Sequence, residues 1–345
     1  MSFDRILLCT DAPKGQGLAY YYYRAFCDVV GAEKVRIVDE GNRNYDSLII
    51  ERGIRRVHRE LGILSKQRHS RLAAELSPAK NIVILFNNAD LDEKAIKDLS
   101  DNQSVYLVNY LSDSPYGIVE PSQKSVLNTI PLFDLVCTFA VDLVPVLYQL
   151  GAKRVERIPF GYCKYTHLEP SQNIAIELPQ KVYYFGTWSK EIESWVNELT
   201  QFDFEIEGNG WGNSSYKKLR EAGTKQKPKT DHNMAITARK AGVVVNFTRA
   251  RHGCFHTMKT FELMIAGACV VSNYSKEQEE FFPGDHVIGY FNTSSELIEK
   301  VKYYLNNARD TEIIREHAKK YALPHSYHDR VSILISLITN LTIAS

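Results

Sequence analysis

The chain reads HTMKTFELMIAGACVVSN from His256 to Asn273, and this stretch predicts a short helix that runs directly into a buried strand. Thr257 is expected to cap the start of the helix, because a threonine hydroxyl accepts hydrogen bonds from free backbone amides. Gly267 is expected to end the helix, since glycine readily adopts the left-handed conformation that closes helices. The apolar residues Ala268–Val271 then predict a strand of a parallel sheet.

The two charged residues of this helix, Lys259 and Glu262, are three positions apart and therefore neighbours on one face. Phe261, Met264 and Ile265 form the opposite, apolar face. A cation near the helix start and a carboxylate one turn later suit a phosphate and a ribose hydroxyl of one nucleotide. The alternative is a surface ion pair that contributes little to stability.

The composition predicts a globular protein with two domains, since 345 residues are too many for one ordinary core. A net charge of +1 provides no overall attraction to nucleic acid or to an anionic membrane. The six cysteines are scattered without metal-site spacing, so we expect buried, reduced thiols and no metal. No segment has the length of a signal peptide core or a transmembrane helix, and we expect a cytoplasmic protein.

Short apolar runs alternate with amphipathic ones along the whole chain, which is typical of parallel sheets with helical crossovers. The expected fold class is α/β, with two doubly wound, Rossmann-like domains. A polar, turn-rich segment from Pro159 to Pro179 is interpreted as the interdomain linker. The expected strands are Ile6–Cys9, Val35–Val38, Ile82–Phe86, Val105–Asn109, Leu135–Thr138, Val155–Ile158, Val182–Phe185, Phe204–Glu207, Val243–Asn246, Ala268–Val271 and Val287–Tyr290.

Ligands of such folds bind at the carboxyl ends of the strands, so the residues that follow each strand are the candidates for a site. The loop after the first strand contains Asp11, Gly15, Gln16 and Gly17. Its glycines suit an anion or a close approach of an acceptor, or simply a tight turn. Asp113 follows the fourth strand and is either a general base or an Asx turn ahead of proline.

Three strand ends in the second half carry small or polar residues that suit a ligand. They contribute Gly186, Thr187 and Trp188, then Gly208 and Trp211, and finally Asn246. Arg249 and Arg251 follow the third of these strands and precede Lys259. Together the three cations suit a diphosphate without a metal ion. The alternative is a solvated basic loop.

At this point the chain resembles the nucleotide-sugar-dependent glycosyltransferases of the GT-B architecture, and more narrowly the CgeB-like, spore-maturation type (glycosyl transferases group 1). The resemblance covers nearly the whole chain, apart from the region 39–80. It rests on FGTW at Phe185, IEGNGW at Ile206, VVVNFTRAR at Val243, KTFELMIAGACVVSN at Lys259, FFPGDHVIGYF at Phe281, the tail from Ser294 to Arg330, YLSDSP at Tyr110, FDLVCTFAVDLVPVLYQLGAKRVERIPFG at Phe133 and the loop from Thr10 to Gly17.

The resemblance implies an N-terminal acceptor-binding domain at 1–165, a C-terminal nucleotide-sugar-binding domain at 166–325, and a terminal helix at 326–345 that crosses back to the first domain. It implies that Glu262 binds the ribose and that Lys259 and Arg249 bind the diphosphate. It also implies that Gly15, Gly17 and Asp113 face the sugar. The remaining donor contacts are expected at Gly186, Thr187, Trp188, Gly208, Trp211, Asn246, Arg251, His256, Thr257 and Thr260.

Two departures from the family pattern affect the stereochemistry that can be inferred. Many retaining relatives carry an acid eight positions before the ribose-binding glutamate, where this chain has Cys254. An arginine that commonly follows the FGT strand is replaced here by Lys190 and Glu191. The sequence therefore leaves open whether the reaction retains or inverts the anomeric configuration.

The predicted function is glycosyl transfer, as a hexosyl- or pentosyltransferase, from a nucleotide-diphosphate sugar. We expect a UDP-sugar as the donor substrate, no other cofactor, no catalytic metal, and a saccharide, glycoconjugate or protein as acceptor. One alternative is transfer to a modified base of phage-type DNA, with the basic segment Lys225–Lys229 on the phosphates. Another is a non-catalytic protein that binds a nucleotide sugar.

Overall fold

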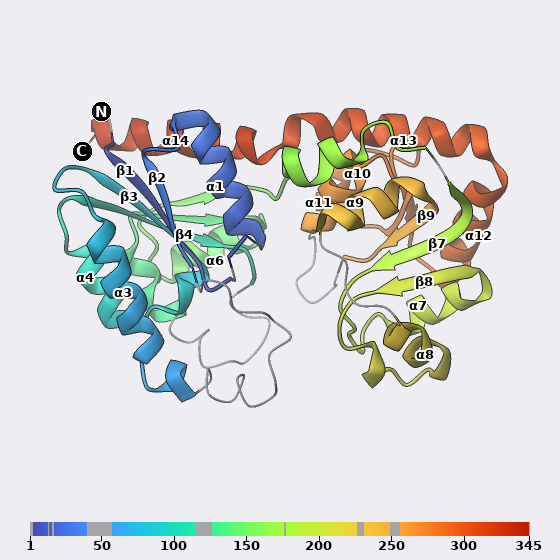
Figure 1. Cartoon of the computed structure of the whole chain (residues 1–345), viewed down its shortest axis with the longest axis horizontal. Helices are drawn as coiled ribbons and strands as arrows, with labels where there is room; N and C mark the ends of the chain where they lie inside the picture. The colour runs from blue at the N-terminus through green and yellow to red at the C-terminus, as the bar shows by residue number, and fades with distance from the viewer. Residues whose placement is uncertain are drawn as a thin grey trace. The chain divides into compact units, whose positions relative to one another are not determined.

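The computed structural model describes residues 3–12, 14–15, 17–39, 57–114, 126–175, 177–225, 231–248 and 256–344. The chain forms two compact units (Figure 1). Unit 1 comprises Met1–Pro159 and His328–Ser345, and unit 2 comprises Phe160–Tyr327. The chain thus passes between the units after Pro159 and again after Tyr327, where the sequence predicts boundaries at 165 and 325.

Unit 1 is built on a six-stranded parallel sheet with the order β2-β1-β3-β4-β5-β6. Its strands are β1 (Arg5–Cys9), β2 (Val35–Val38), β3 (Asn81–Phe86), β4 (Val105–Leu111), β5 (Leu135–Thr138) and β6 (Val155–Arg157). Its helices are α1 (Gly17–Val30), α3 (Ile63–Glu75), α4 (Glu93–Ser100), α6 (Leu143–Gln149) and α14 (Tyr327–Ala344).

The last helix, α14, is held on unit 1 by two contacts near its start. His328 Nε2 lies 2.7 Å from Asp28 Oδ2 of α1, and Arg330 Nε donates to the carbonyl oxygen of Pro159 at 3.0 Å. The end of the chain therefore completes the first unit, although more than 160 residues of unit 2 separate it from the rest of that unit.

Unit 2 is built on a five-stranded parallel sheet with the order β11-β10-β9-β7-β8. Its strands are β7 (Leu178–Phe185), β8 (Asp203–Glu207), β9 (Ala241–Asn246), β10 (Val270–Asn273) and β11 (Gly289–Phe291). Its helices are α7 (Glu193–Glu198), α8 (Lys217–Lys225), α9 (Asp231–Lys240), α10 (Met258–Ile265), α11 (Lys276–Phe281), α12 (Ser294–Asn306) and α13 (Ala308–Ala322).

All eleven expected strands are present, so the predicted α/β architecture with two parallel sheets is confirmed. β7 starts four residues earlier than expected, at Leu178 instead of Val182, and β10 starts at Val270 instead of Ala268. Gly267 has φ = 75°, and the amide of Ala268 donates to the carbonyl oxygen of Leu263 at 3.1 Å. Because Ala268 still closes the end of α10 in this way, the chain needs further residues before it can pair with β9.

The segment interpreted as an interdomain linker is instead an ordered part of unit 2. It contains a π-helix at Lys164–Leu168 and a 3-10 helix at Glu169–Ser171, and the π-helix contacts both α9 and α10. His167 is fully buried, and Ser171 Oγ donates to the carbonyl oxygen of His167 at 2.8 Å. The polar residues that suggested a loop thus form local hydrogen bonds that let the segment pack.

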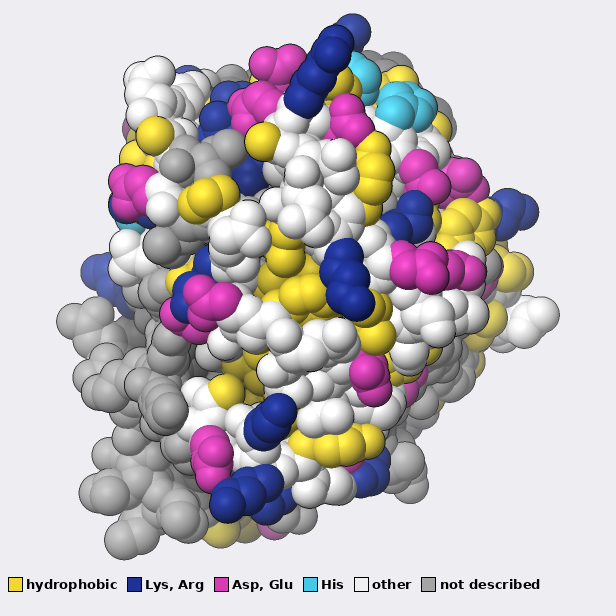
Figure 2. Space-filling view, turned by 90° about the vertical axis from the view of Figure 1, so that its right-hand side faces the viewer, with side chains coloured by type: hydrophobic (Ala, Val, Ile, Leu, Met, Phe, Trp, Pro, Cys, Tyr) yellow, Lys and Arg dark blue, Asp and Glu magenta, His cyan; other side chains and the backbone are white. Residues whose placement is uncertain are grey.

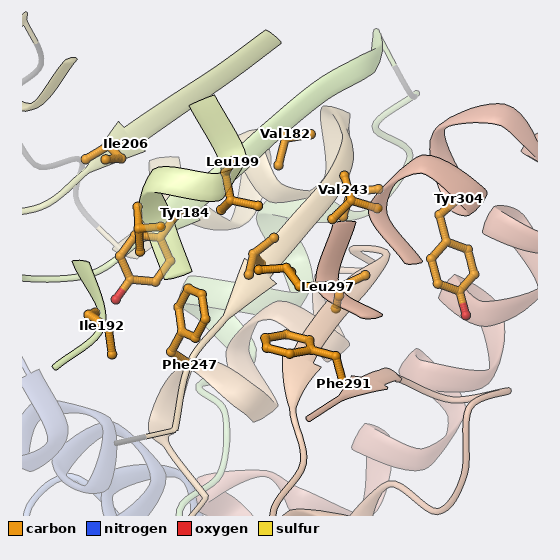
Figure 3. Close-up of a cluster of buried hydrophobic side chains, with 14 of the residues drawn as sticks. Val182, Tyr184, Ile192, Leu199, Ile206, Val243, Phe247, Phe291, Leu297 and Tyr304 are labelled. Carbon is orange, nitrogen blue, oxygen red and sulfur yellow. The ribbon is translucent and has the colours of Figure 1, made fainter. Parts of the chain in front are cut away.

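The core of unit 2 lies between the sheet and its helices, as Figure 3 shows. Strand residues such as Val182 and Val243 are fully buried and belong to the same hydrophobic cluster as Leu297 of α12. Phe247, just after β9, has its ring centroid 5.4 Å from that of Tyr184 and 5.9 Å from that of Phe291. These edge-to-face pairs stabilise the unit directly beneath the carboxyl ends of its strands.

The surface carries both signs of charge, as the low net charge predicts. On the face shown in Figure 2, basic and acidic side chains are intermixed over the described residues, with hydrophobic side chains between them. Cys9, Cys137, Cys163 and Cys269 are buried thiols and Cys27 is half-buried, all without disulfides. Within the described part of the chain, no helix combines the length and apolarity that a bilayer crossing requires.

Candidate functional site

The predicted start of α10 is confirmed, because Thr257 is its N-cap. The amide of Thr260 donates to Thr257 Oγ1, and the amide of Thr257 donates to Thr260 Oγ1, each at 3.3 Å. This reciprocal pair is a capping box in which threonine takes the place of the usual glutamate. The cap fixes where α10 begins and therefore where Lys259, in its first turn, is held.

A cavity of about 140 Å³ lies at the carboxyl ends of β7 and β8. It brings together four of the residues predicted as donor contacts, namely Gly186, Thr187, Gly208 and Lys259. These residues come from three separate stretches of sequence. The strand-end argument therefore located a real concave site in unit 2. The complete lining is Phe185, Gly186, Thr187, Glu207, Gly208, Asn209, Asp231, Met234 and Lys259.

The cavity wall carries one cation and two carboxylates among its described residues. Lys259 Nζ lies 3.6 Å from Met234 Sδ, while Glu207 and Asp231 supply the negative charges. Glu207 is the last residue of β8, so the strand-end rule could have identified it. Asp231 begins α9, and only the tertiary structure brings that helix to the cavity.

The glycines at the two strand ends lie where a larger residue would not fit. A Cβ on Gly208 would lie 2.0 Å from the carbonyl oxygen of Gly186, and a Cβ on Gly186 would lie 2.3 Å from the hydroxyl oxygen of Tyr184. No real Cβ tolerates such distances, so both positions require glycine for packing alone. The glycines thus shape the cavity by setting the spacing of its walls.

The side chains of Trp188 and Trp211, both expected near the donor, form contacts within the protein. Trp211 is 1% exposed and is part of the core. The indole Nε1 of Trp188 donates to Glu193 Oε2 at 3.0 Å. Burial opposes the ionisation of Glu193, but hydrogen bonds from Lys190, Trp188 and Ser215 lower its pKa below the usual range. This cluster explains why Lys190 follows the FGT strand, since its ammonium group neutralises a buried carboxylate.

Asn246 and Thr260 belong to a buried polar network beneath α10 and do not line the cavity. Asn246 Nδ2 lies 3.4 Å from Thr260 Oγ1, and Thr260 Oγ1 donates to Gln278 Oε1 at 2.9 Å. Gln278 Nε2 in turn donates to Ser272 Oγ at 3.1 Å. The network joins β9, β10, α10 and α11, so these side chains hold the helix on the sheet.

His256 is also used within the protein. Its Nε2 accepts a hydrogen bond from the amide of Phe160 at 3.1 Å, and its Nδ1 lies 3.2 Å from Glu277 Oε2. His256 and Glu277 are each 1% exposed. Both ring nitrogens therefore face protein groups, and the imidazole secures the first residue of unit 2.

Glu262 is buried at 2% exposure, which rules out the surface ion pair considered as its alternative role. Burial raises the pKa of Glu262 from 4.5 to about 7, although the nearby charge of Lys259 acts in the opposite direction. Its Oε1 lies 3.6 Å from Nε2 of His167. Sequence reasoning missed His167, because the segment that carries it looked like a linker.

In unit 1, the glycines of the loop after β1 have positive φ angles, which glycine adopts more readily than other residues. Gly15 and Gly17 have φ = 81° and 77°, and no heavy atom lies within 4 Å of a Cβ placed on Gly15. Both glycines thus adopt the left-handed backbone conformation that a side chain disfavours. Asp11 is half-buried beside it.

Asp113 is exposed just beyond β4. Asn87, which follows β3, forms hydrogen bonds with Ser112, the residue before Asp113. Asn87 Nδ2 donates to Ser112 Oγ at 2.7 Å, and the amide of Ser112 donates to Asn87 Oδ1 at 2.9 Å. Asn87 Nδ2 is also 3.5 Å from Asp113 Oδ2. The side chain of Asn87 thus determines how the chain leaves β4.

Asn87 begins a turn in which four consecutive residues, Asn87–Asp90, have φ between 49° and 60°. This left-handed conformation costs non-glycine residues roughly 1–2 kcal/mol each, although asparagine and aspartate tolerate it better. Asp90 forms an ion pair with Arg59 at 2.9 Å, and Arg68 donates to the carbonyl oxygen of Ala89. Strain held by such contacts often occurs next to functional sites.

Three predicted site residues, Arg249, Arg251 and Gln16, lie outside the described residues, as does most of the basic segment Lys225–Lys229. Among the residues that are described, no group of three or more histidine, cysteine, aspartate or glutamate side chains has the arrangement of a metal site.

A family model described as "Glycosyl transferase-like" matches residues 190–336. A search of curated proteins finds no match. Among solved structures, the chain is similar to HepE from Anabaena in complex with UDP and glucose, with a TM-score of 0.65, 15% identity, and coverage of 98% of this chain and 99% of that chain. Sucrose-phosphate synthase from Thermosynechococcus elongatus has a TM-score of 0.66, 12% identity and complete coverage of both chains.

The chain has the GT-B fold. Trehalose 6-phosphate synthase from Burkholderia multivorans shares this fold with a TM-score of 0.63, 10% identity and complete coverage of both chains. Within the GT-B fold of this chain, the match to the family model covers most of unit 2. It includes the cavity residues Glu207, Asp231 and Lys259, whereas Gly186 and Thr187 lie a few residues before its start.

Proposed function

We propose that this protein is a glycosyltransferase that takes a sugar from a nucleotide-diphosphate sugar. The observation that carries the proposal is the convergence of Gly186, Thr187, Gly208 and Lys259 on one cavity at the strand ends of unit 2. The match to a glycosyl transferase-like model over 190–336 supports it. The FGTW and KTFELMIAGACVVSN motifs favour the CgeB-like group within GT-B enzymes.

We propose a UDP-sugar as the donor, because HepE, a structure with the same fold, was solved with UDP and glucose and with UDP-glucose. Lys259 would contact the diphosphate, and Glu262 the ribose hydroxyls. Since Glu207 and Asp231 offset the charge of Lys259 in the cavity, a diphosphate needs further cations. Arg249 and Arg251 follow β9 directly and are the candidates for that role.

In the proposed reaction, the bond between the anomeric carbon and the diphosphate oxygen breaks while the acceptor oxygen bonds to that carbon. Negative charge develops on the leaving diphosphate, and Lys259 and Arg249 stabilise it without a metal ion. For an inverting reaction, the carboxylate of Asp113 would take the proton of the acceptor hydroxyl, whereas for a retaining reaction the leaving diphosphate would take it. The proposed acceptor is a saccharide, a glycoconjugate or a protein.

A thermal-shift screen tests the donor assignment. The purified protein is mixed with the diphosphates of uridine, guanosine, adenosine and thymidine, and then with their sugars. A ligand that binds the folded state stabilises it, by about 2.7 kcal/mol when the free ligand concentration is a hundredfold above Kd. This stabilisation raises Tm. We expect UDP and a UDP-sugar to give the largest shift. No shift with any nucleotide would contradict the proposed function.

Replacing Lys259 by alanine tests the site itself. We expect kcat/KM for the donor to fall by about 100- to 1000-fold, because a cation aimed at the developing charge is lost. Lys302→Ala provides the matched control, since Lys302 is exposed on α12. Release of UDP from the UDP-sugar is the measurement. Unchanged release by Lys259→Ala would overturn the role of Lys259 in the phosphate site.

A further inference from the structure

His167 occupies a buried position that leaves its imidazole in one defined state. It lies in the π-helix Lys164–Leu168 and has 0% exposure. Its Nδ1 accepts a hydrogen bond from the amide of Cys163 at 3.0 Å. Burial and, to a smaller extent, the charge of Lys259 lower the pKa of His167 from 6.5 to about 3. The ring is therefore neutral, and its single proton resides on Nε2.

The Nε2–H group of His167 lies near the buried carboxylate of Glu262. Nε2 lies 3.6 Å from Glu262 Oε1, which is close but longer than a hydrogen bond. Among the described residues, the other ionisable groups that act on Glu262 are Lys259 of the same helix and Asp231 of α9. Glu262 thus has a neutral donor from the π-helix, a cation from its own helix and a carboxylate from α9 around it.

We propose that His167 is a positioning residue that orients the carboxylate of Glu262 for the ribose of the donor nucleotide. This inference rests on the proposed function, in which Glu262 accepts hydrogen bonds from the ribose hydroxyls. Nε2–H holds one carboxylate oxygen, so that the other is presented to the sugar in a defined direction. The distance from Nε2 to Oε1 closes to hydrogen-bond length when the nucleotide binds.

The geometry favours this role over simple core packing. A histidine that only filled space would not require a fixed tautomer, whereas the amide of Cys163 selects the tautomer that carries its proton on Nε2. π-helical turns are rare and frequently occur at functional sites. Here the π-helix packs against α10, the helix that carries Glu262, and against α9, which carries Asp231.

Two substitutions test the roles of the two ring nitrogens of His167 separately. In His167→Asn, the amide oxygen lies as many bonds from Cα as Nδ1 does, so the contact with Cys163 can persist while the donor at Nε2 is lost. In His167→Gln, the amide nitrogen lies as many bonds from Cα as Nε2 does, so the donor to Glu262 is restored. Each variant is first compared with the wild type by circular dichroism and Tm.

The measurement is UDP binding by isothermal titration calorimetry between pH 6 and pH 8.5. We expect His167→Asn to bind UDP about tenfold to a hundredfold more weakly, since a hydrogen bond to a charged group is lost. We also expect the pH at which its affinity rises to shift upward, because a donor on the carboxylate favours the ionised form. His167→Gln is expected to recover most of the wild-type affinity and pH dependence.

Two results contradict the proposal in different ways. Wild-type affinity and pH dependence in a folded His167→Asn protein would overturn the role of His167 and leave the proposed function intact. Absence of UDP binding by the wild-type protein would overturn both. If His167→Asn does not fold, the Gln variant decides: weak UDP binding by a folded His167→Gln protein, with the pH dependence of the wild type, would overturn the proposal.

Discussion

Trp211 donates its indole N–H to the carbonyl oxygen of Gly186, with Nε1 and the oxygen 2.8 Å apart. The bond joins the residues after β8 to the residue after β7. Trp211 is nearly fully buried, so the cavity between these strand ends is held in shape by a side chain that does not line it.

Replacing Trp211 by phenylalanine keeps an aromatic ring and removes the donor. We expect a loss of about 1–3 kcal/mol, because the carbonyl of Gly186 loses a buried hydrogen bond. For a unit of this size, that lowers Tm by roughly 2–4 °C for each kcal/mol. UDP affinity should also fall, since Gly186 moves. Wild-type values of both Tm and Kd would contradict this account.

Adding one methyl group at Gly208 should disturb the same contact from the other side. In Gly208→Ala, the new Cβ would meet the carbonyl oxygen of Gly186 at 2.0 Å, so the backbone must shift. We expect a cost of about 1–3 kcal/mol and weaker UDP binding, measured by thermal unfolding and calorimetry. Gly212→Ala is the matched control, because no heavy atom lies within 4 Å of its added Cβ.

Nucleotide binding should be linked to the ionisation of Glu262. Burial raises the pKa of this carboxyl to about 7, so it is largely protonated in the empty site below that pH. Ribose hydroxyls donate to the ionised form, so UDP binding should release a proton. We expect affinity to increase with pH up to about 7 and then to level off. Calorimetry in buffers of different ionisation enthalpy measures the released proton directly.

The control for this pH dependence is Glu262→Gln, which has no titrating group. The phosphate of UDP also titrates, near pH 6, and contributes equally in both proteins. The difference between the two pH profiles therefore isolates the carboxyl. The same pKa shift has a consequence for folding, because a carboxyl with a raised folded-state pKa opposes stability as pH rises from about 4.5 to 7. Parallel pH profiles of UDP affinity for the wild type and Glu262→Gln would contradict the link between nucleotide binding and the ionisation of Glu262.

The left-handed turn in unit 1 should depend on the charge of Asp90. In Asp90→Asn, the new residue still tolerates the backbone conformation, but the ion pairs with Arg59 and Arg68 are lost. Since Asp90 and Arg68 are each 6% exposed, we expect a destabilisation of roughly 3 kcal/mol, measured by thermal unfolding. UDP affinity should remain unchanged, because the cavity belongs to unit 2.

An exposed ion pair provides the comparison for Asp90. Lys217 and Glu221 are 3.8 Å apart on α8, and both are well exposed. Lys217→Gln should therefore change stability by no more than about 0.5 kcal/mol. An equally small effect for Asp90→Asn would show that the turn does not rely on its buried charges.

The features that depended on local sequence were predicted well. The N-cap at Thr257, the closing Gly267 and all eleven strands follow from short-range patterns of hydrophobicity and backbone preference. The same patterns failed at residues 159–179, where polar residues suggested a linker. Those residues form hydrogen bonds within a packed segment, and a count of polar side chains cannot distinguish the two cases.

The sequence by itself determined that this chain is an α/β protein with two parallel sheets, because the alternation of apolar strands with amphipathic helices and the ends of those helices depend on neighbouring residues. Only the tertiary structure decided which candidates reach the cavity. Lys259 and Gly208 line it, whereas Asn246 and His256 are used inside unit 2. The pairing of His167 with Glu262 was likewise decided by packing, since the partners are 95 residues apart and burial controls the pKa values of both.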